Sequence, residues 1–213
     1  MSNHLSNYVM VGVGTSAVLS LLFNRIRSTN TPTPAPSSDS SSSTPTKTTT
    51  IRVAYGTQTG TSLKLAHLFA NSSNSSNTPS KLPATATTSV VDMKTYDVDN
   101  LEKENVIVFI MCTWEGGVPP ESAKIFCDWL EDMAHDFRVP NTFLANTSYA
   151  VFGLGSSEYA PVDRFCTAAL RLDENMHRLG AKRIVDVGLG DASQVRFVFS
   201  LFLVVLCYFV IVL

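Results

Sequence analysis

Residues 57–62 have the composition of a loop that binds an anion. They lie between an apolar strand pattern at 51–55 and a helical pattern at 62–71, and none of them is charged. Backbone N–H groups and hydroxyls at the start of a helix converge on one point, where the helix dipole adds partial positive charge. Because the segment lacks the second glycine and the lysine of a Walker loop, it suits a monophosphate better than a triphosphate with Mg²⁺. The residues of this candidate phosphate loop are Thr57, Gln58, Thr59, Gly60, Thr61 and Ser62.

Two later segments, 113–119 and 153–159, each place an aromatic side chain beside glycines. Trp114 belongs to the first segment and Tyr159 to the second. Either aromatic alone could simply cap the end of a sheet. Three such loops in one domain favour a ligand with a flat ring that lies between the two aromatics. The candidate residues in these two loops are Thr113, Trp114, Glu115, Gly116, Gly153, Leu154, Gly155, Ser156 and Tyr159.

The sequence around these loops alternates between strand and helix patterns. The predicted strands are 51–55, 87–93, 105–112, 148–154 and 183–189, and the predicted helices are 62–71, 97–103, 120–137 and 162–180. This alternation predicts an α/β fold with a doubly wound, five-stranded parallel sheet and right-handed crossovers. The three loops follow the first, third and fourth strands, and ligands bind at the carboxyl ends of such strands. Asp191 follows the fifth strand. A role in the ligand site and a role as a solvated turn residue explain it equally well.

Charge and cysteine spacing exclude two classes of site. The 16 lysines and arginines are scattered and fewer than the 18 acidic residues, so no direct contact with nucleic acid is expected. The four cysteines, at positions 112, 127, 166 and 207, form neither a CxxC nor a CxxxCxxC motif. We therefore expect no metal site and no iron–sulfur cluster in this chain.

The composition divides the chain into four parts. Residues 1–27 are a candidate membrane anchor, 28–50 a disordered Ser/Thr/Pro linker, 51–193 the globular domain and 194–213 a hydrophobic tail.

Two uncharged runs, 5–23 and 197–213, have about the length of a membrane-spanning helix. Arg25 and Arg27 follow the first run, which places the rest of the chain in the cytosol. The alternative for the second run is a buried terminal helix or strand. The sequence thus predicts a protein that is anchored in the membrane of the endoplasmic reticulum, with its globular domain facing the cytosol.

Three stretches resemble the site for flavin mononucleotide (FMN) in flavodoxin-like domains. They are YGTQTGTS, TWEGGVPPESAKIFCDWL and YAVFGLGSSEYA. They resemble most closely the amino-terminal domain of the 4-demethylwyosine synthases, the wybutosine-synthesising enzymes of tRNA. The resemblance covers residues 51–191, and the FMN modules of diflavin reductases share the same three loops.

The resemblance implies that residues 57–61 bind the FMN phosphate. It implies that residues 113–116 line one edge of the isoalloxazine ring and that Gly153, Leu154, Gly155 and Tyr159 line the other, with Tyr159 stacking on the ring. Ser62 and Ser156 complete the expected cofactor-binding set. The implied function is electron transfer by bound FMN.

In that family the flavin domain passes electrons to a radical-SAM domain with an iron–sulfur cluster. The implied partners are that acceptor domain and an NADPH-dependent reductase as electron donor. We expect that this chain is truncated before the radical-SAM domain, cannot complete the tRNA reaction alone, and lacks the last helix of the fold. The alternatives are an FMN module of a diflavin reductase and an inactive, membrane-associated fragment.

Overall fold

The computed structural model describes residues 49–74, 86–157 and 165–191, together with Phe199 and Phe202. All of them lie within one compact unit, residues Thr46–Leu213.

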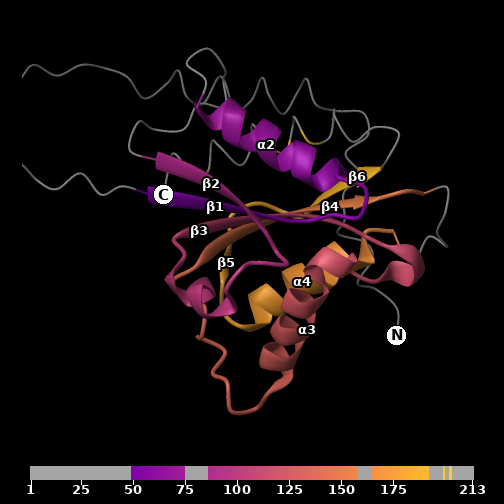
Figure 1. The fold of residues 1–213 in the computed structure, drawn as a ribbon. Helices are drawn as coiled ribbons and strands as arrows, with labels where there is room; N and C mark the ends of the chain where they lie inside the picture. Colours follow the sequence, from indigo (N-terminus) through magenta and orange to yellow (C-terminus); the bar gives the residue numbers. More distant parts are fainter. Residues whose placement is uncertain (1–48, 75–85, 158–164, 192–198, 200–201, 203–213) are drawn as a thin grey trace, which may run out of the picture. The chain divides into compact units, whose positions relative to one another are not determined.

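A parallel sheet forms the middle layer of the fold (Figure 1). Its strands are β1 (Thr49–Gly56), β2 (Ala86–Asp92), β3 (Val106–Cys112), β4 (Ser148–Gly155), β5 (Lys182–Arg183) and β6 (Gly188–Asp191). The order is β2-β1-β3-β4-β5, β6 also pairs with β4, and every pairing is parallel. The predicted parallel sheet with crossovers is therefore confirmed.

The predicted fifth strand differs from the observed one, because it is split into β5 and β6. Tyr149 of β4 pairs with Arg183, and Phe152 pairs with Gly188, so four residues intervene on the fifth strand against two on β4. The break brings Gly188 onto the ring of Phe152, where a Cβ atom would lie 2.5 Å from Cδ2 of that ring. Only glycine fits so close an approach.

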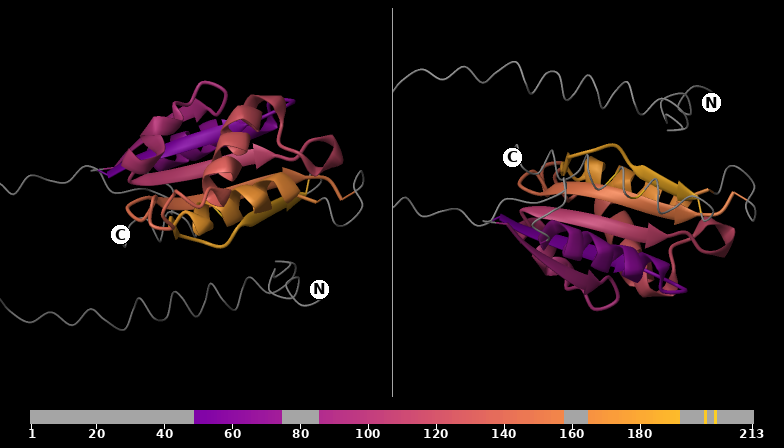
Figure 2. Two further views of the ribbon diagram at one scale, coloured as in Figure 1. Left: turned by 90° about the horizontal axis from the view of Figure 1, so that it is seen from below. Right: turned by 90° about the horizontal axis from the view of Figure 1, so that it is seen from above.

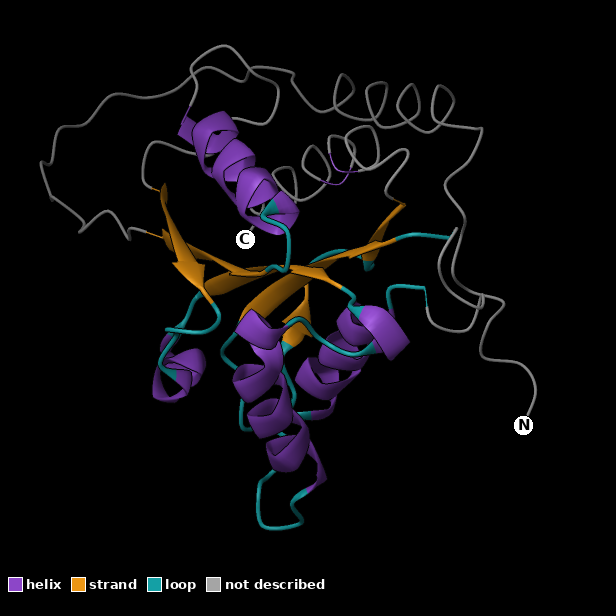
Figure 3. Cartoon of the chain, turned by 45° about the vertical axis from the view of Figure 1, so that its right-hand side comes forward, coloured by secondary structure: helices purple, strands orange, loops and turns teal. Residues whose placement is uncertain are grey.

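Helices cover both faces of the sheet. The α-helix α2 (Thr61–Asn74) lies on one face, while α3 (Glu121–His135) and α4 (Thr167–Arg178) lie on the other (Figure 3). Seen from below, α3 and α4 lie next to each other over the strands (Figure 2). Two short 3₁₀ helices, η2 (Val98–Lys103) and η3 (Glu115–Gly117), stand before β3 and after it. The start of the predicted helix 162–180 falls at 167, after residues outside the described part of the chain.

The core lies on both sides of the central strand β3, in which all residues but Cys112 are buried. Val108 and Ile110 face α2, where Leu65 and Phe69 pack on them in one cluster. Ile107, Phe109 and Met111 face α3 and α4 in a second cluster. The continuous apolar run of β3 thus reflects a strand that is covered on both faces.

The prediction of a membrane-anchored protein requires correction. No helix in the described part of the chain is both long enough and apolar enough to cross a membrane. The two runs on which the prediction rested lie outside the described residues, except for Phe199 and Phe202.

Phe199 and Phe202 have helical backbone and are 3% and 6% exposed. Their ring centroids lie 4.9 and 5.1 Å from that of Phe152, on the α2 face of the sheet. These two residues cover strand β4 on that face. For them, the alternative of a buried terminal element is the correct one.

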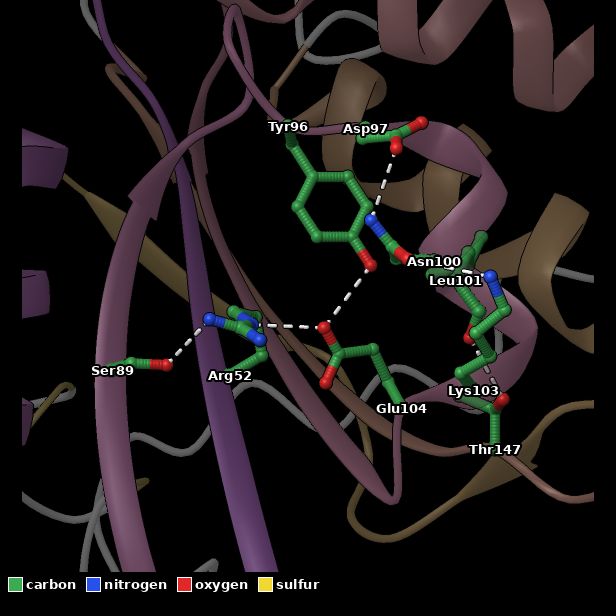
Figure 4. Close-up of polar contacts among 9 residues, drawn as sticks. All are labelled: Arg52, Ser89, Tyr96, Asp97, Asn100, Leu101, Lys103, Glu104 and Thr147. Atoms are coloured by element: carbon green, nitrogen blue, oxygen red, sulfur yellow. Dashed lines mark hydrogen bonds and ion pairs between the residues drawn. The ribbon is translucent and has the colours of Figure 1, made fainter.

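A polar network ties η2 to the sheet (Figure 4). Arg52 of β1 donates to Oε1 of Glu104 at 2.8 Å and to the hydroxyl of Ser89 in β2 at 2.8 Å. The Tyr96 hydroxyl donates to the same Glu104 oxygen at 3.3 Å. Because the Glu104 side chain is only 7% exposed, this carboxylate depends on Arg52 and Tyr96 for the contacts that water would otherwise supply.

Two thiols should make the fold sensitive to alkaline pH. Burial, with smaller effects of nearby carboxylates, raises the pKa of both Cys127 and Cys166 from 9.0 to about 12. The unfolded chain therefore releases these protons first, so stability is intact below about pH 9 and falls as pH rises from 9 towards 12. We expect urea unfolding under reducing conditions to show a loss approaching about 1.4 kcal/mol per pH unit for each thiol. The double variant Cys127→Ala/Cys166→Ala should have a flatter profile, and an unchanged profile would contradict this assignment.

Candidate functional site

The phosphate loop adopts a fixed turn between β1 and α2. Gly60 has φ +86°, a conformation that favours glycine. Its N–H donates to the Thr57 hydroxyl at 2.9 Å, and its carbonyl accepts from Lys64 N–H in the first turn of α2 at 3.1 Å. The loop thus closes on itself and presents its remaining donors at the helix N-terminus.

Several hydroxyls of the site have no strong partner within the described residues. Those of Thr59 and Thr61 are exposed and lie 3.5 Å from each other. Ser62 is fully buried and its oxygen has no nitrogen or oxygen partner, and the same holds for the buried Oγ1 of Thr113 at the end of β3. Unsatisfied buried hydroxyls are costly. These residue types, with no acid in the loop, fit an anionic oxygen ligand such as a phosphate.

The Cys112 thiol lies under the phosphate loop, beside the backbone of Gln58 and the hydroxyl of Ser62. Burial raises the pKa of Cys112, and these two neighbours offset the increase only in part. The thiol is therefore uncharged at neutral pH and adds no negative charge that would oppose an anion.

Ser122, in the first turn of α3, holds the first residue of the phosphate loop. Its hydroxyl accepts from Thr57 N–H at 2.8 Å and donates to the Thr57 carbonyl at 2.9 Å. Next to it, Gly56 lies so close to the helix that a Cβ there would be 2.7 Å from Cβ of Ala123. Sequence reasoning missed Ser122, and the only available signal was a hydroxyl two residues after Pro120, where the predicted helix begins.

The second predicted loop, after β3, forms a compact turn. Trp114 N–H donates to the Val118 carbonyl at 2.8 Å, and Gly117 N–H donates to the Trp114 carbonyl at 3.0 Å. Gly116 has φ +80° within η3. The side chains of Trp114 and Val118 are 46% and 43% exposed, which is unusual for large apolar residues and leaves them available to a ligand or partner.

A groove of about 450 Å³ between α3 and α4 brings two of the predicted residues together. Gln58 from the phosphate loop and Trp114 from the second loop both line it. Leu130 and Leu172 form part of its apolar wall. The structure therefore joins the first two predicted loops on one side of the molecule.

The third predicted loop is tied to the neighbouring strand end. Thr113 N–H donates to the Leu154 carbonyl at 2.8 Å, which links it to the second loop. Ser157 donates from its backbone N–H, at 3.4 Å, and from its hydroxyl to Oδ2 of Asp191. Asp191 thus ends β6 and is hydrogen-bonded to the exposed Ser157. Ser156 lies in the described part of this loop, whereas Tyr159 lies outside the described residues.

Gly153 and Gly155 have a packing role that the sequence did not reveal. A Cβ at Gly153 would lie 2.6 Å from Cβ of Ala169, and one at Gly155 would lie 2.9 Å from the ring of Phe165. Both glycines therefore let α4 and the segment before it approach β4 closely. Their glycine identity alone is consequently no evidence for a ligand.

Comparison with known proteins agrees with this geometry. The profile of the flavodoxin family matches residues 53–196. The chain is also similar to S-adenosyl-L-methionine-dependent tRNA 4-demethylwyosine synthase TYW1 of Xenopus laevis, with 39% identity over 150 residues. That match covers 68% of this chain and 19% of the relative. The human enzyme of the same name is 36% identical over the same shares of the two chains. This chain thus spans about a fifth of the length of these relatives.

Solved flavodoxins share the fold at low sequence identity. A flavodoxin of Streptococcus pneumonia TIGR4 superposes with a TM-score of 0.57 at 19% identity, covering 76% of this chain and 97% of the other. A mutant of the flavodoxin from Pseudomonas aeruginosa gives a TM-score of 0.59 at 17% identity, with shares of 76% and 98%.

Proposed function

Because this chain belongs to the flavodoxin family, we propose that it binds FMN and transfers electrons through it. The family and the fold imply a flavin cofactor. The observation that carries the proposal is a pair of buried hydroxyls that lack a nitrogen or oxygen partner among the described residues. Ser62 lies in the first turn of α2, which follows β1, and Thr113 directly follows the adjacent strand β3. A phosphorylated ligand would supply acceptors to the donors at this edge of the sheet.

In this proposal the phosphate loop holds the FMN phosphate through its hydroxyls and the N–H groups at the start of α2. Trp114, Glu115 and Gly116 line one edge of the ring, and the residues at the end of β4 line the other. The bound flavin supplies reversible electron transfer. The chain's own residues bind and orient the cofactor, and Trp114 shields part of it from water.

We further propose that the electrons serve the formation of 4-demethylwyosine in tRNA. The similarity to the 4-demethylwyosine synthases over the flavodoxin region supports this assignment. An NADPH-dependent reductase would donate the electrons, and a radical-SAM domain with an iron–sulfur cluster would accept them. The proposal covers the electron-transfer step alone and assigns the carbon chemistry and the tRNA contacts to the acceptor.

Titration of the full 213-residue chain with FMN tests the proposal. We expect flavin fluorescence to be quenched at one FMN per chain, because an aromatic side chain in contact with the isoalloxazine ring quenches its excited state by electron transfer. Riboflavin should bind at least about tenfold more weakly, since it lacks the phosphate and the charge-assisted hydrogen bonds to it. A folded chain that leaves FMN fluorescence unchanged would overturn the proposed function.

A further inference from the structure

The hydroxyl of Ser122 joins the two loops that the proposed function assigns to opposite ends of FMN. The phosphate loop follows β1, whereas the second loop follows β3 and leads through Pro119 and Pro120 into α3. Ser122 makes two hydrogen bonds to the phosphate loop. Among the described residues, these are the only bonds between nitrogen and oxygen atoms that connect segment 57–62 with segment 113–122.

Both bonds of Ser122 go to the same residue, Thr57. At 2.8 and 2.9 Å they have ordinary, near-optimal lengths, and they engage both the N–H and the C=O of Thr57. The Thr57 N–H is therefore already used inside the protein and is not among the donors left for a ligand. A single hydroxyl thus fixes the orientation of the backbone where the chain leaves β1.

The loop beyond Thr57 depends on this orientation. The Thr57 hydroxyl accepts from Gly60 N–H at 2.9 Å, so the position of Thr57 determines how the turn at Gly60 closes. Gly60 in turn begins the hydrogen bonding of α2 through Lys64. Fixing Thr57 therefore fixes the hydroxyls and N–H groups that follow it.

We propose that Ser122 is a positioning residue that pre-organises the phosphate loop relative to the second loop (113–119), so that FMN affinity depends on Ser122 through the phosphate. This inference rests on the proposed function. Ser122 itself needs no contact with the cofactor. A site held in its binding geometry before the ligand arrives avoids the entropy cost of ordering on binding.

The test compares Ser122→Ala with Ser89→Ala in the full chain, by titration with FMN and with riboflavin. Ser89 is the matched control, since its hydroxyl also makes a 2.8 Å hydrogen bond but contacts Arg52, outside the candidate site. We expect Ser122→Ala to weaken FMN binding about tenfold and to change riboflavin binding less than about twofold. Ser89→Ala should change the affinity for neither ligand.

An isosteric pair keeps the test decisive if Ser122→Ala lowers the folded fraction. Ser122→Thr retains the hydroxyl and should bind FMN within about twofold of the unsubstituted chain, whereas Ser122→Val should show the tenfold loss. Equal FMN affinities for these two variants would overturn the positioning role. A Ser122 variant that loses affinity for FMN and riboflavin to the same extent would overturn it as well. If the unsubstituted chain binds FMN in that experiment, the proposed function stands and only the role of Ser122 fails.

Discussion

Replacing Thr59 with aspartate is expected to weaken FMN binding by at least about a hundredfold while the fold stays intact. The Thr59 side chain is exposed, so a carboxylate there is solvated and costs the folded state little. Its hydroxyl lies 3.5 Å from that of Thr61, within the group of donors assigned to the phosphate. Two like charges about 5 Å apart near a protein surface repel by about 3 kcal/mol, which corresponds to more than a hundredfold in affinity.

The neutral variant Thr59→Asn is the matched control for this charge. It has the shape of aspartate and a hydrogen-bonding amide, so its FMN affinity should fall far less, by about tenfold or under. Riboflavin should bind equally to both variants, because it has no phosphate to repel. If aspartate and asparagine weaken FMN alike, the phosphate lies elsewhere and the loop assignment is wrong.

Much of the fold could be predicted because its signals are local. The unbroken apolar run of β3 is characteristic of a strand covered on both faces, and the structure buries it between two clusters. Alternating strands and helices restrict the topology to parallel strands with crossovers. From that topology it follows that the loops after β1, β3 and β4 share one edge of the sheet.

The features that could not be predicted depend on contacts between distant residues. Ser122 and Thr57 are 65 residues apart in sequence, and nothing local marks their hydrogen bonds. The division of the fifth strand brings Gly188 against Phe152, a contact that a strand pattern does not reveal. Glycines near the end of β4 suggested a ligand, whereas Gly153 and Gly155 also serve the packing of the segment that leads into α4.

Hydropathy misled the interpretation of the C-terminal segment for a physical reason. An apolar run of this length has the same composition whether it faces lipid or the interior of a domain. Phe199 and Phe202 lie three residues apart and both pack on Phe152, so their side chains share one helical face. Their burial was invisible in the sequence because Phe152, their contact in β4, is nearly fifty residues earlier.

The buried acid Asp173 is expected to contribute more to stability than any exposed charge of the described chain. It is 8% exposed in α4 and binds groups from two strands. The Tyr149 hydroxyl donates to its Oδ1 at 3.0 Å, and Arg183 of β5 donates to both of its carboxylate oxygens, with 2.8 Å from Nε to Oδ1. Asp173 thereby joins α4 to β4 and β5.

Substituting Asp173→Ala should lower the free energy of unfolding by about 3 kcal/mol. The substitution leaves the guanidinium of Arg183 without a counter-charge. The hydroxyl of the fully buried Tyr149 loses its carboxylate partner but keeps the backbone carbonyl of residue 173, at 3.0 Å. Breaking a buried pair costs about 3–5 kcal/mol, and we take the lower end because Arg183 is 34% exposed and water can partly replace its partner. Urea unfolding of the full chain measures the change.

The neighbouring Glu174→Ala provides the matched control. Glu174 also pairs with an arginine, Arg178, at 3.2 Å, but both side chains are largely exposed, so its loss should cost less than about 0.5 kcal/mol. In an Arg183→Met background the cost of Asp173→Ala should shrink, because no guanidinium is then left without its partner. Equal costs at positions 173 and 174 would mean that burial does not strengthen the Asp173 network. The union of α4 with the sheet would then depend on apolar packing alone.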